Sequence, residues 1–90
     1  MKEIDFTKVV AIISFEGETK EFNIAKKLGN LMMFNSSVLL DIGFEDLAKE
    51  IYYSTGPVCV DEKYIPAIKQ VVVNSEYIAA VKRAVIKLLS

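Results

Sequence analysis

The chain has 90 residues, 52% of them hydrophobic and 26% charged, and its 11 basic and 12 acidic residues give a net charge of −1. This length suits a single domain over residues 1–90, and the apolar content excludes an intrinsically disordered chain. Because there is no histidine and only one cysteine, Cys59, the sequence excludes a Ser-His-Asp triad, an internal disulfide and the usual histidine or cysteine metal sites.

Other signatures of enzymes, carriers and membrane proteins are also missing. The four glycines lie far apart, so no glycine-rich loop could hold a phosphate. The carboxylates do not follow the spacing of a calcium-binding loop. The longest uncharged stretch, residues 28–40, is shorter than the roughly 20 residues of a membrane helix, and no segment has the pattern of a signal peptide. We therefore expect a cytoplasmic, non-enzymatic protein without catalytic residues, cofactor, metal site or membrane segment.

A β-hairpin is predicted near the N-terminus. Residues 8–15 are rich in valine and isoleucine without helical spacing, which favours a strand. Both faces of this strand are largely apolar, so we expect it to be central and covered on both sides. Glu16-Gly17 predicts a two-residue turn in which Gly17 has a positive φ. Residues 18–22 return as a second strand with the charges typical of a sheet edge.

A first helix is predicted over residues 24–34. Asn23 is expected to cap it, because its side-chain oxygen can accept a hydrogen bond from the first turn. The inner stripe of this helix consists of Ile24, Leu28, Leu31 and Met32. The Asn-Ser-Ser run of residues 35–37 breaks the helix.

The second predicted helix has the clearest periodicity. Its apolar residues recur at positions i, i+3, i+4, i+7 and i+8, which are Phe44, Leu47, Ala48, Ile51 and Tyr52. Gly56 is expected to end this helix in a left-handed conformation, before a proline that cannot continue it.

The C-terminal part is predicted to hold a short strand and two helices. Residues 58–60 favour a strand that lies beside residues 8–15, and Asp61 is expected to cap a helix that runs to residue 73. Pro66 removes a backbone donor one turn inside this helix, and the three valines at 71–73 prefer a strand, so helix and strand both remain open for residues 61–73. A final helix follows Asn74-Ser75. Its inner positions are Ile78, Val81, Val85, Leu88 and Leu89.

The predicted order is therefore β-β-α-α-β-α-α. This order indicates an α+β domain, in which an N-terminal β-hairpin and a short third strand form a small sheet. About four helices are expected to pack with that sheet.

Residues 23–30, with the sequence Asn-Ile-Ala-Lys-Lys-Leu-Gly-Asn, follow the predicted hairpin. Together with Glu50-Ile51-Tyr52-Tyr53 and residues 75–89, they resemble small uncharacterised bacterial proteins, some of them carried by prophages or other mobile elements. The resemblance spans most of the chain and implies that residues 61–73 are helical. It implies no activity.

The thiol and the acidic clusters are expected to be structural. Two valines flank Cys59 and no histidine can act as its base, so we expect a small buried side chain instead of a reactive thiol. The acidic groups are Glu16, Glu18 and Glu21 on the hairpin, and Asp41, Glu45 and Asp46 at the second helix. They are expected to be solvated or to complement the helix dipole.

Three large side chains are predicted to lie on the polar faces of their helices. Met33 and Phe34 share a helix face with Lys26 and Asn30, and Tyr53 lies four residues after Lys49. Methionine and aromatic side chains are enriched at protein contact surfaces. We therefore predict a small interaction or assembly module, acting as a homodimer or with a larger protein partner. Another segment, such as residues 38–42, could instead cover these side chains.

The alternative prediction is a small nucleic-acid-associated regulator. Lys82, Arg83 and Lys87 lie on the last helix after a short break, as in a recognition helix. The apolar stripe of the same helix and the slightly negative net charge weigh against this alternative.

Overall fold

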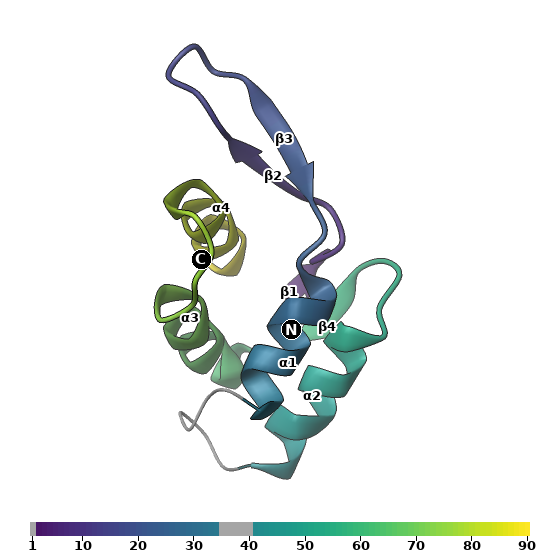
Figure 1. The fold of residues 1–90 in the computed structure, drawn as a ribbon. Coiled ribbons are helices and arrows are strands. Elements are labelled where there is room, and N and C mark those ends of the chain that lie inside the picture. Colours follow the sequence, from purple (N-terminus) through teal and green to yellow (C-terminus); the bar gives the residue numbers. More distant parts are fainter. Residues whose placement is uncertain (1, 35–40) are drawn as a thin grey trace.

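A computed structural model describes residues 2–34 and 41–90, in the order β-β-β-α-α-β-α-α. The α+β class and four helices agree with the sequence prediction (Figure 1). The elements are β1 (Lys2–Ile4), β2 (Val9–Ile12), β3 (Thr19–Phe22), α1 (Ala25–Phe34), α2 (Ile42–Tyr52), β4 (Val58–Val60), the 3-10 turn η1 (Glu62–Tyr64), α3 (Ile65–Val73) and α4 (Ala79–Leu89). The predicted break at residues 35–37 lies outside the described residues.

The strands form two separate two-stranded sheets. β4 pairs antiparallel with β1, with Ile4 opposite Val58, whereas β2 pairs with β3. The prediction that residues 58–60 lie beside the first hairpin strand is therefore wrong. β1 has only three residues, which is too short to show a strand alternation in the sequence.

The β2–β3 hairpin projects beyond the helices (Figure 1). The amide of Ile13 donates to the carbonyl of Glu18 at 2.8 Å, and that of Gly17 donates to the carbonyl of Ser14 at 3.2 Å. These bonds close a four-residue loop instead of the predicted two-residue turn. Gly17 has a φ of 89°, so the predicted positive φ is confirmed.

β2 is not covered on both faces, in contrast to the prediction. Val9 and Ala11 are buried, whereas the side chains of Val10 and Ile12 on the opposite face are 58% and 64% exposed. The apolar character of both faces therefore does not reflect a central strand. It leaves the side chains of Val10 and Ile12 on β2 open to solvent.

Side-chain caps fix where α1 and α2 begin. Asn23 accepts from the amide of Ala25 at 3.2 Å, as predicted. Asp41 accepts from the amides of Gly43 and Phe44 at 2.7 and 3.2 Å, which starts α2. The predicted left-handed Gly56 is wrong, because α2 already ends at Tyr52 and Gly17 is the glycine with positive φ in the described part of the chain.

Residues 62–73 are helical and Asp61 caps them, which resolves the open alternative. Asp61 accepts from the amide of Lys63 at 3.1 Å and begins η1, which leads into α3. Pro66 lies in the first turn of α3, where a helix does not need its missing N–H. Val71 and Val72 are buried, and this packing outweighs their weak helix propensity.

α4 buries only part of its predicted inner stripe. Val81, Val85 and Leu89 are buried, whereas Ile78 and Leu88 are exposed. Ile78 is extended at the N-cap position, so it does not share the helical face.

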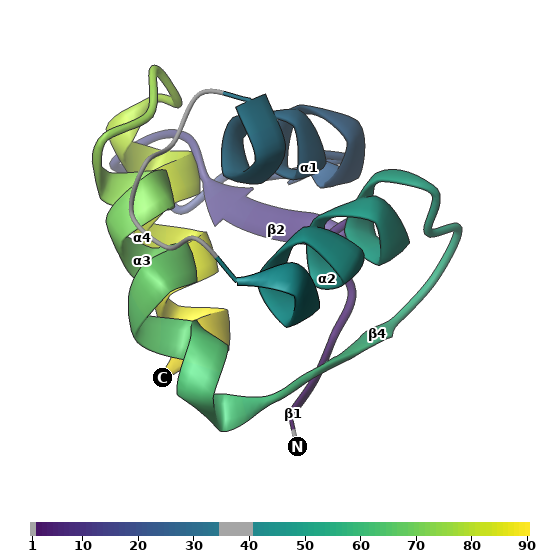
Figure 2. The same ribbon diagram turned by 90° about the horizontal axis from the view of Figure 1, so that it is seen from below.

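The helices form two pairs, α1 with α2 and α3 with α4, around one core (Figure 2). Every buried side chain among the described residues is hydrophobic. The largest fully buried ones are Phe6, Phe44, Leu28, Ile51, Ile68 and Leu89. No helix in the described ranges is long and apolar enough to cross a membrane.

α1 and α2 lie close together at Gly29. A Cβ atom at this position would lie 2.7 Å from the Cβ of Tyr52 and 2.8 Å from the carbonyl oxygen of Ala48. Glycine at position 29 therefore allows α1 to pack closely against α2.

Candidate functional site

One hollow lies between β2 with its following loop and α4. It has a volume of about 540 Å³ and we name it the hairpin groove. Its lining residues are Val10, Ile12, Ile13, Ser14, Phe15, Ala80, Arg83, Ala84 and Lys87. The walls are thus hydrophobic on the hairpin side, and small or cationic on the helix side.

The α4 wall has a simple origin in the sequence. Ala80, Arg83, Ala84 and Lys87 follow the spacing i, i+3, i+4 and i+7, so they share one face of the helix. This face lies beside the buried stripe and faces the hairpin. The two alanines leave room for the hollow, and the exposed Arg83 and Lys87 give it positive charge.

The hairpin wall includes an unpaired strand edge. Because Ile13 is hydrogen-bonded to Glu18, alternate residues Val9 and Ala11 are also in hydrogen-bonded pairs with β3. The backbone groups of Val10 and Ile12 therefore face the opposite edge of β2. Within the described residues no other strand pairs with this edge, and no other backbone hydrogen bond reaches Val10 or Ile12.

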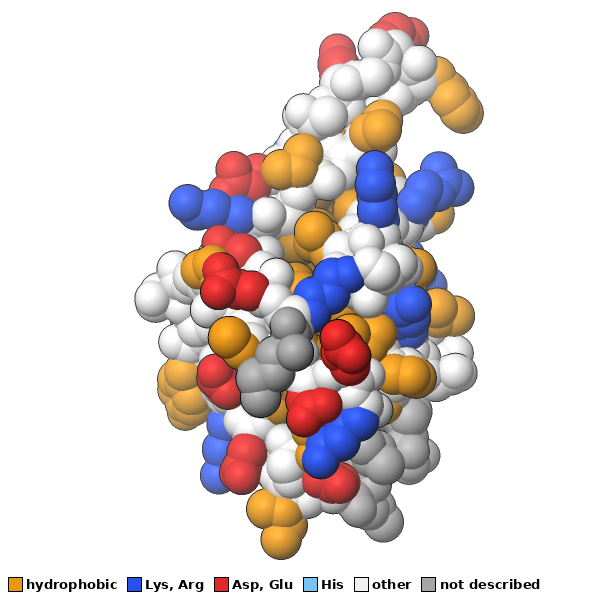
Figure 3. Space-filling view, turned by 180° about the vertical axis from the view of Figure 1, so that it is seen from behind, with side chains coloured by type: hydrophobic (Ala, Val, Ile, Leu, Met, Phe, Trp, Pro, Cys, Tyr) orange, Lys and Arg blue, Asp and Glu red, His pale blue; other side chains and the backbone are white. Residues whose placement is uncertain are grey.

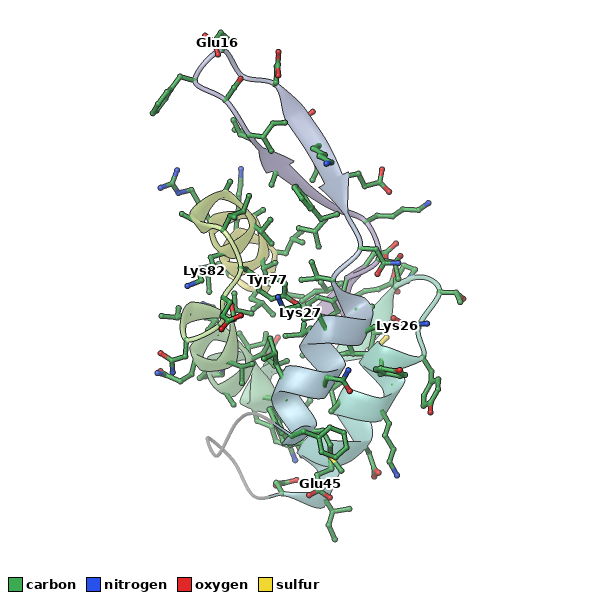
Figure 4. The ribbon with its side chains drawn as sticks, in the orientation of Figure 1. Glu16, Lys26, Lys27, Glu45, Tyr77 and Lys82 are labelled. Carbon is green, nitrogen blue, oxygen red and sulfur yellow. The ribbon has the colours of Figure 1, made fainter. Side chains whose placement is uncertain are left out.

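Four hydrophobic side chains of β2 and the loop that follows it are exposed. Val10, Ile12, Ile13 and Phe15 are all exposed, and Phe15 fully so. Figure 3 shows hydrophobic side chains along the projecting hairpin, with lysine and arginine side chains gathered where it meets the body. Acidic side chains lie at the tip, including Glu16 (Figure 4).

The three predicted basic residues do not form one surface. Arg83 and Lys87 line the hairpin groove, but Lys82 does not. The ammonium of Lys82 donates to the carbonyl of Val73 at 3.0 Å, at the end of α3 and away from the hairpin (Figure 4). Such a contact satisfies a free carbonyl at a helix C-terminus.

The structure does bring the predicted residues Met33, Phe34 and Tyr53 together. They line a second hollow of about 300 Å³ between α1 and α2, which we name the α1–α2 groove. Phe34 and Tyr53 are 75% and 77% exposed, whereas Met33 is half-buried and packs against the core. The predicted covering segment, residues 38–42, lies mostly outside the described residues.

A tyrosine pair gives the α1–α2 groove an aromatic wall. The rings of Tyr52 and Tyr53 meet edge to face, with centroids 4.9 Å apart. The ammonium of Lys26 lies 5.9 Å from the centroid of the Tyr52 ring. Outside this groove, the ammonium of Lys27 lies 4.9 Å from the centroid of the Tyr77 ring (Figure 4).

The shifted pKa values of Asp41 and Tyr77 have structural causes. The hydroxyl of Tyr64 donates to Asp41 at 2.9 Å, and this bond lowers the pKa of the Asp41 carboxyl, which caps α2. Burial raises the pKa of Tyr77 to about 12.

The hairpin glutamates are exposed, as predicted. In the part of the chain that the structure describes, no three acidic or cysteine side chains gather as a metal site would require.

The prediction that Cys59 is buried is wrong. Its thiol is exposed, because Val58 and Val60 take the inward positions of β4 and the strand alternation turns Cys59 outward.

Comparison with known proteins gives no match to a family model, a curated protein or a solved structure. The functional argument therefore rests on the two grooves and the chemistry of their walls.

Proposed function

We propose that this protein is a small non-enzymatic interaction module that binds a protein partner through the hairpin groove. The observation that carries this proposal is an exposed, apolar and unpaired strand edge beside a cationic helix face. Proteins commonly protect such edges with charges, proline or a covering segment. Residues 9–13 contain none of these charges and no proline.

The number of exposed hydrophobic side chains on the hairpin supports the same proposal. Soluble monomers expose isolated hydrophobic side chains freely, but large contiguous patches mark contact sites. Here four large hydrophobic side chains, Val10, Ile12, Ile13 and Phe15, are exposed within six residues of one projecting element, which is a concentration of apolar surface instead of an isolated side chain. The α1–α2 groove, with Phe34 and Tyr53, offers a second contact surface for assembly.

The nucleic-acid alternative has less support. Binding to a phosphate backbone depends on several cations that face the same ligand. Arg83 and Lys87 do so in the hairpin groove, but Lys82 is held at the end of α3.

Cross-linking in the cells that make the protein tests the proposal. Phe15 is replaced by the photoreactive benzoylphenylalanine, which keeps an aromatic side chain at a fully exposed position. The matched control carries the same group at Glu45, which lies at the opposite end of the molecule (Figure 4). We expect a discrete protein adduct from position 15 and not from position 45.

Two results would overturn the proposal. Adducts to nucleic acid at position 15 would favour the regulator, and no specific adduct at position 15 would remove the case for this contact surface. An adduct between two copies of the chain would keep the interaction function and identify it as self-assembly.

A further inference from the structure

Building on the proposed function, we propose that the hairpin groove binds an extended, acidic segment of the partner as an added strand on β2. Three independent features of the groove support this mode of binding: the backbone groups of its strand edge, the shape of its helix wall and its charge.

The strand edge supplies the backbone contacts. Val10 and Ile12 each present one N–H and one C=O group at the outer edge of β2. These residues are two positions apart, which is the spacing at which an extended chain offers its own outward groups. Addition of a strand to an exposed edge is a common way to bind peptides, because backbone bonds give affinity independently of sequence.

The α4 wall leaves space for side chains of the added strand. Ala80 and Ala84 face the groove with the smallest side chains that a helix wall can carry apart from glycine. The volume of about 540 Å³ falls within the range of about 300–1,000 Å³ typical of ligand sites. Alternate side chains of a bound segment could therefore enter between β2 and α4.

The charge of the groove selects an acidic segment. Of the residues that line it in the described chain, Arg83 and Lys87 are the charged ones, and both are positive. The chain as a whole has a net charge of −1, so this positive charge is local. Arginine and lysine bind carboxylates through strong charge-assisted hydrogen bonds.

A second copy of the chain fits less well. Pairing of β2 with its own copy would place residues 9–13 in the groove, and these residues carry no carboxylate. Arg83 and Lys87 would then face a strand without opposite charge. A partner segment in which acidic and β-branched residues alternate satisfies both the strand edge and the two cations.

Selection from a displayed library of random nonapeptides, with the purified full chain as target, tests the charge preference. We expect enriched peptides with net negative charge and alternating hydrophobic residues. A synthetic copy of the most enriched peptide should bind the Arg83→Glu/Lys87→Glu variant about tenfold more weakly or worse, as expected for a lost charge-assisted bond. The matched control, Lys82→Glu, should bind it like the parent, because Lys82 lies outside the groove.

Two further arms test strand addition. Ile12→Pro removes an outward N–H that β3 does not use, and proline is tolerated on strand edges. This variant should lose peptide binding, whereas Ile12→Val should keep it. If Ile12→Pro does not fold, peptides that carry N-methyl groups at alternate residues test the same bonds on the parent protein. One of the two methylated registers should lose binding.

Several results would overturn the inference. These are the absence of enriched peptides, enrichment of basic peptides, equal binding of both methylated registers, and self-association that blocks the groove. If a protein still cross-links to position 15 in such a case, the proposed function stands and only the acidic-strand inference fails. If no adduct forms there, the proposed function fails as well.

Discussion

Substitution of Gly29 by alanine separates intrinsic helix propensity from helix packing. On propensity alone, Gly29→Ala should stabilise α1 by about 1 kcal/mol. In the structure, however, the new Cβ would lie 2.7 Å from the Cβ of Tyr52 and 2.8 Å from the carbonyl oxygen of Ala48. Carbon atoms in contact normally lie about 3.5–4.0 Å apart. Neither obstructing atom can rotate away, so α1 and α2 must move apart.

The expected net effect is destabilisation. Overpacking of a core costs about 1–3 kcal/mol. The new Cβ would clash with the Tyr52 Cβ and the Ala48 carbonyl oxygen, which cannot move without the backbone, so the cost for Gly29→Ala should lie towards the upper end of this range. Subtracting the propensity gain leaves a loss of about 1–2 kcal/mol in the free energy of unfolding. For a domain of this size, that corresponds to a fall of about 5–15 °C in the melting temperature.

Urea and thermal unfolding followed by far-UV circular dichroism measure this loss. The matched control is Gly56→Ala, where a Cβ would meet nothing within 4 Å and φ is not positive. It should change the free energy of unfolding by less than about 0.5 kcal/mol. Equal or greater stability of Gly29→Ala would refute the close approach of α1 and α2, and with it the geometry of the α1–α2 groove.

Four further predictions concern the loop, a cap, the thiol and the α1–α2 groove. Gly17→Val should lose about 1–2 kcal/mol in urea unfolding because of its positive φ of 89°, and unchanged stability would contradict the loop. The pKa of Asp41 is lowered from 3.8 in the folded protein, so the free energy of unfolding should fall as the pH drops below 3.8 and this carboxyl is protonated. The fall should be less steep for Asp41→Asn, and identical pH profiles of the parent and this variant would exclude the contribution. Cys59 is exposed, so Ellman's reagent should label it in the native protein about as fast as in urea, and strong native protection would contradict the outward thiol. Phe34→Ser with Tyr53→Lys should reduce self-association in sedimentation without changing the melting temperature at low concentration, whereas unfolding of this double variant would identify both rings as core residues.

Local signals in the sequence predict the buried face of α2 and the positive φ of Gly17, although not the length of the loop that contains Gly17. The recurrence of Phe44, Leu47, Ala48 and Ile51 marks the buried face of α2, and all four are buried. Gly17 has the predicted positive φ because few other residues adopt it without strain. Such features depend on neighbours along the chain, so a single sequence contains the information that fixes them.

Strand pairing could not be predicted in the same way. β1 and β4 meet across more than fifty residues, and nothing in three residues of β1 indicates its partner. For the same reason, the sequence predicts a β2 strand that is covered on both faces and a buried Cys59. Both predictions are wrong, because one face of β2 and the Cys59 side chain are exposed. An apolar strand face is equally consistent with a core and with a binding surface.

The two grooves differ in how far the sequence predicts them. The helical spacing predicts that Met33, Phe34 and Tyr53 lie on polar faces, and the packing of α1 on α2 brings them together. The hairpin groove depends on where α4 lies relative to β2, which no periodicity gives. The sequence signals only its helix wall, through the basic residues Arg83 and Lys87 and through Ala80 and Ala84, which lie one turn apart.

Residue-resolved amide hydrogen exchange along β2 tests the central claim, that the outer edge of this strand is free to bind a partner. In the isolated protein at low concentration, the amides of Ala11 and Ile13 should be protected, because they face β3. Those of Val10 and Ile12 should exchange rapidly, because no backbone group of the described chain accepts from them. Protection of Val10 and Ile12 equal to that of Ala11 would show that the edge is already occupied, and would contradict the account.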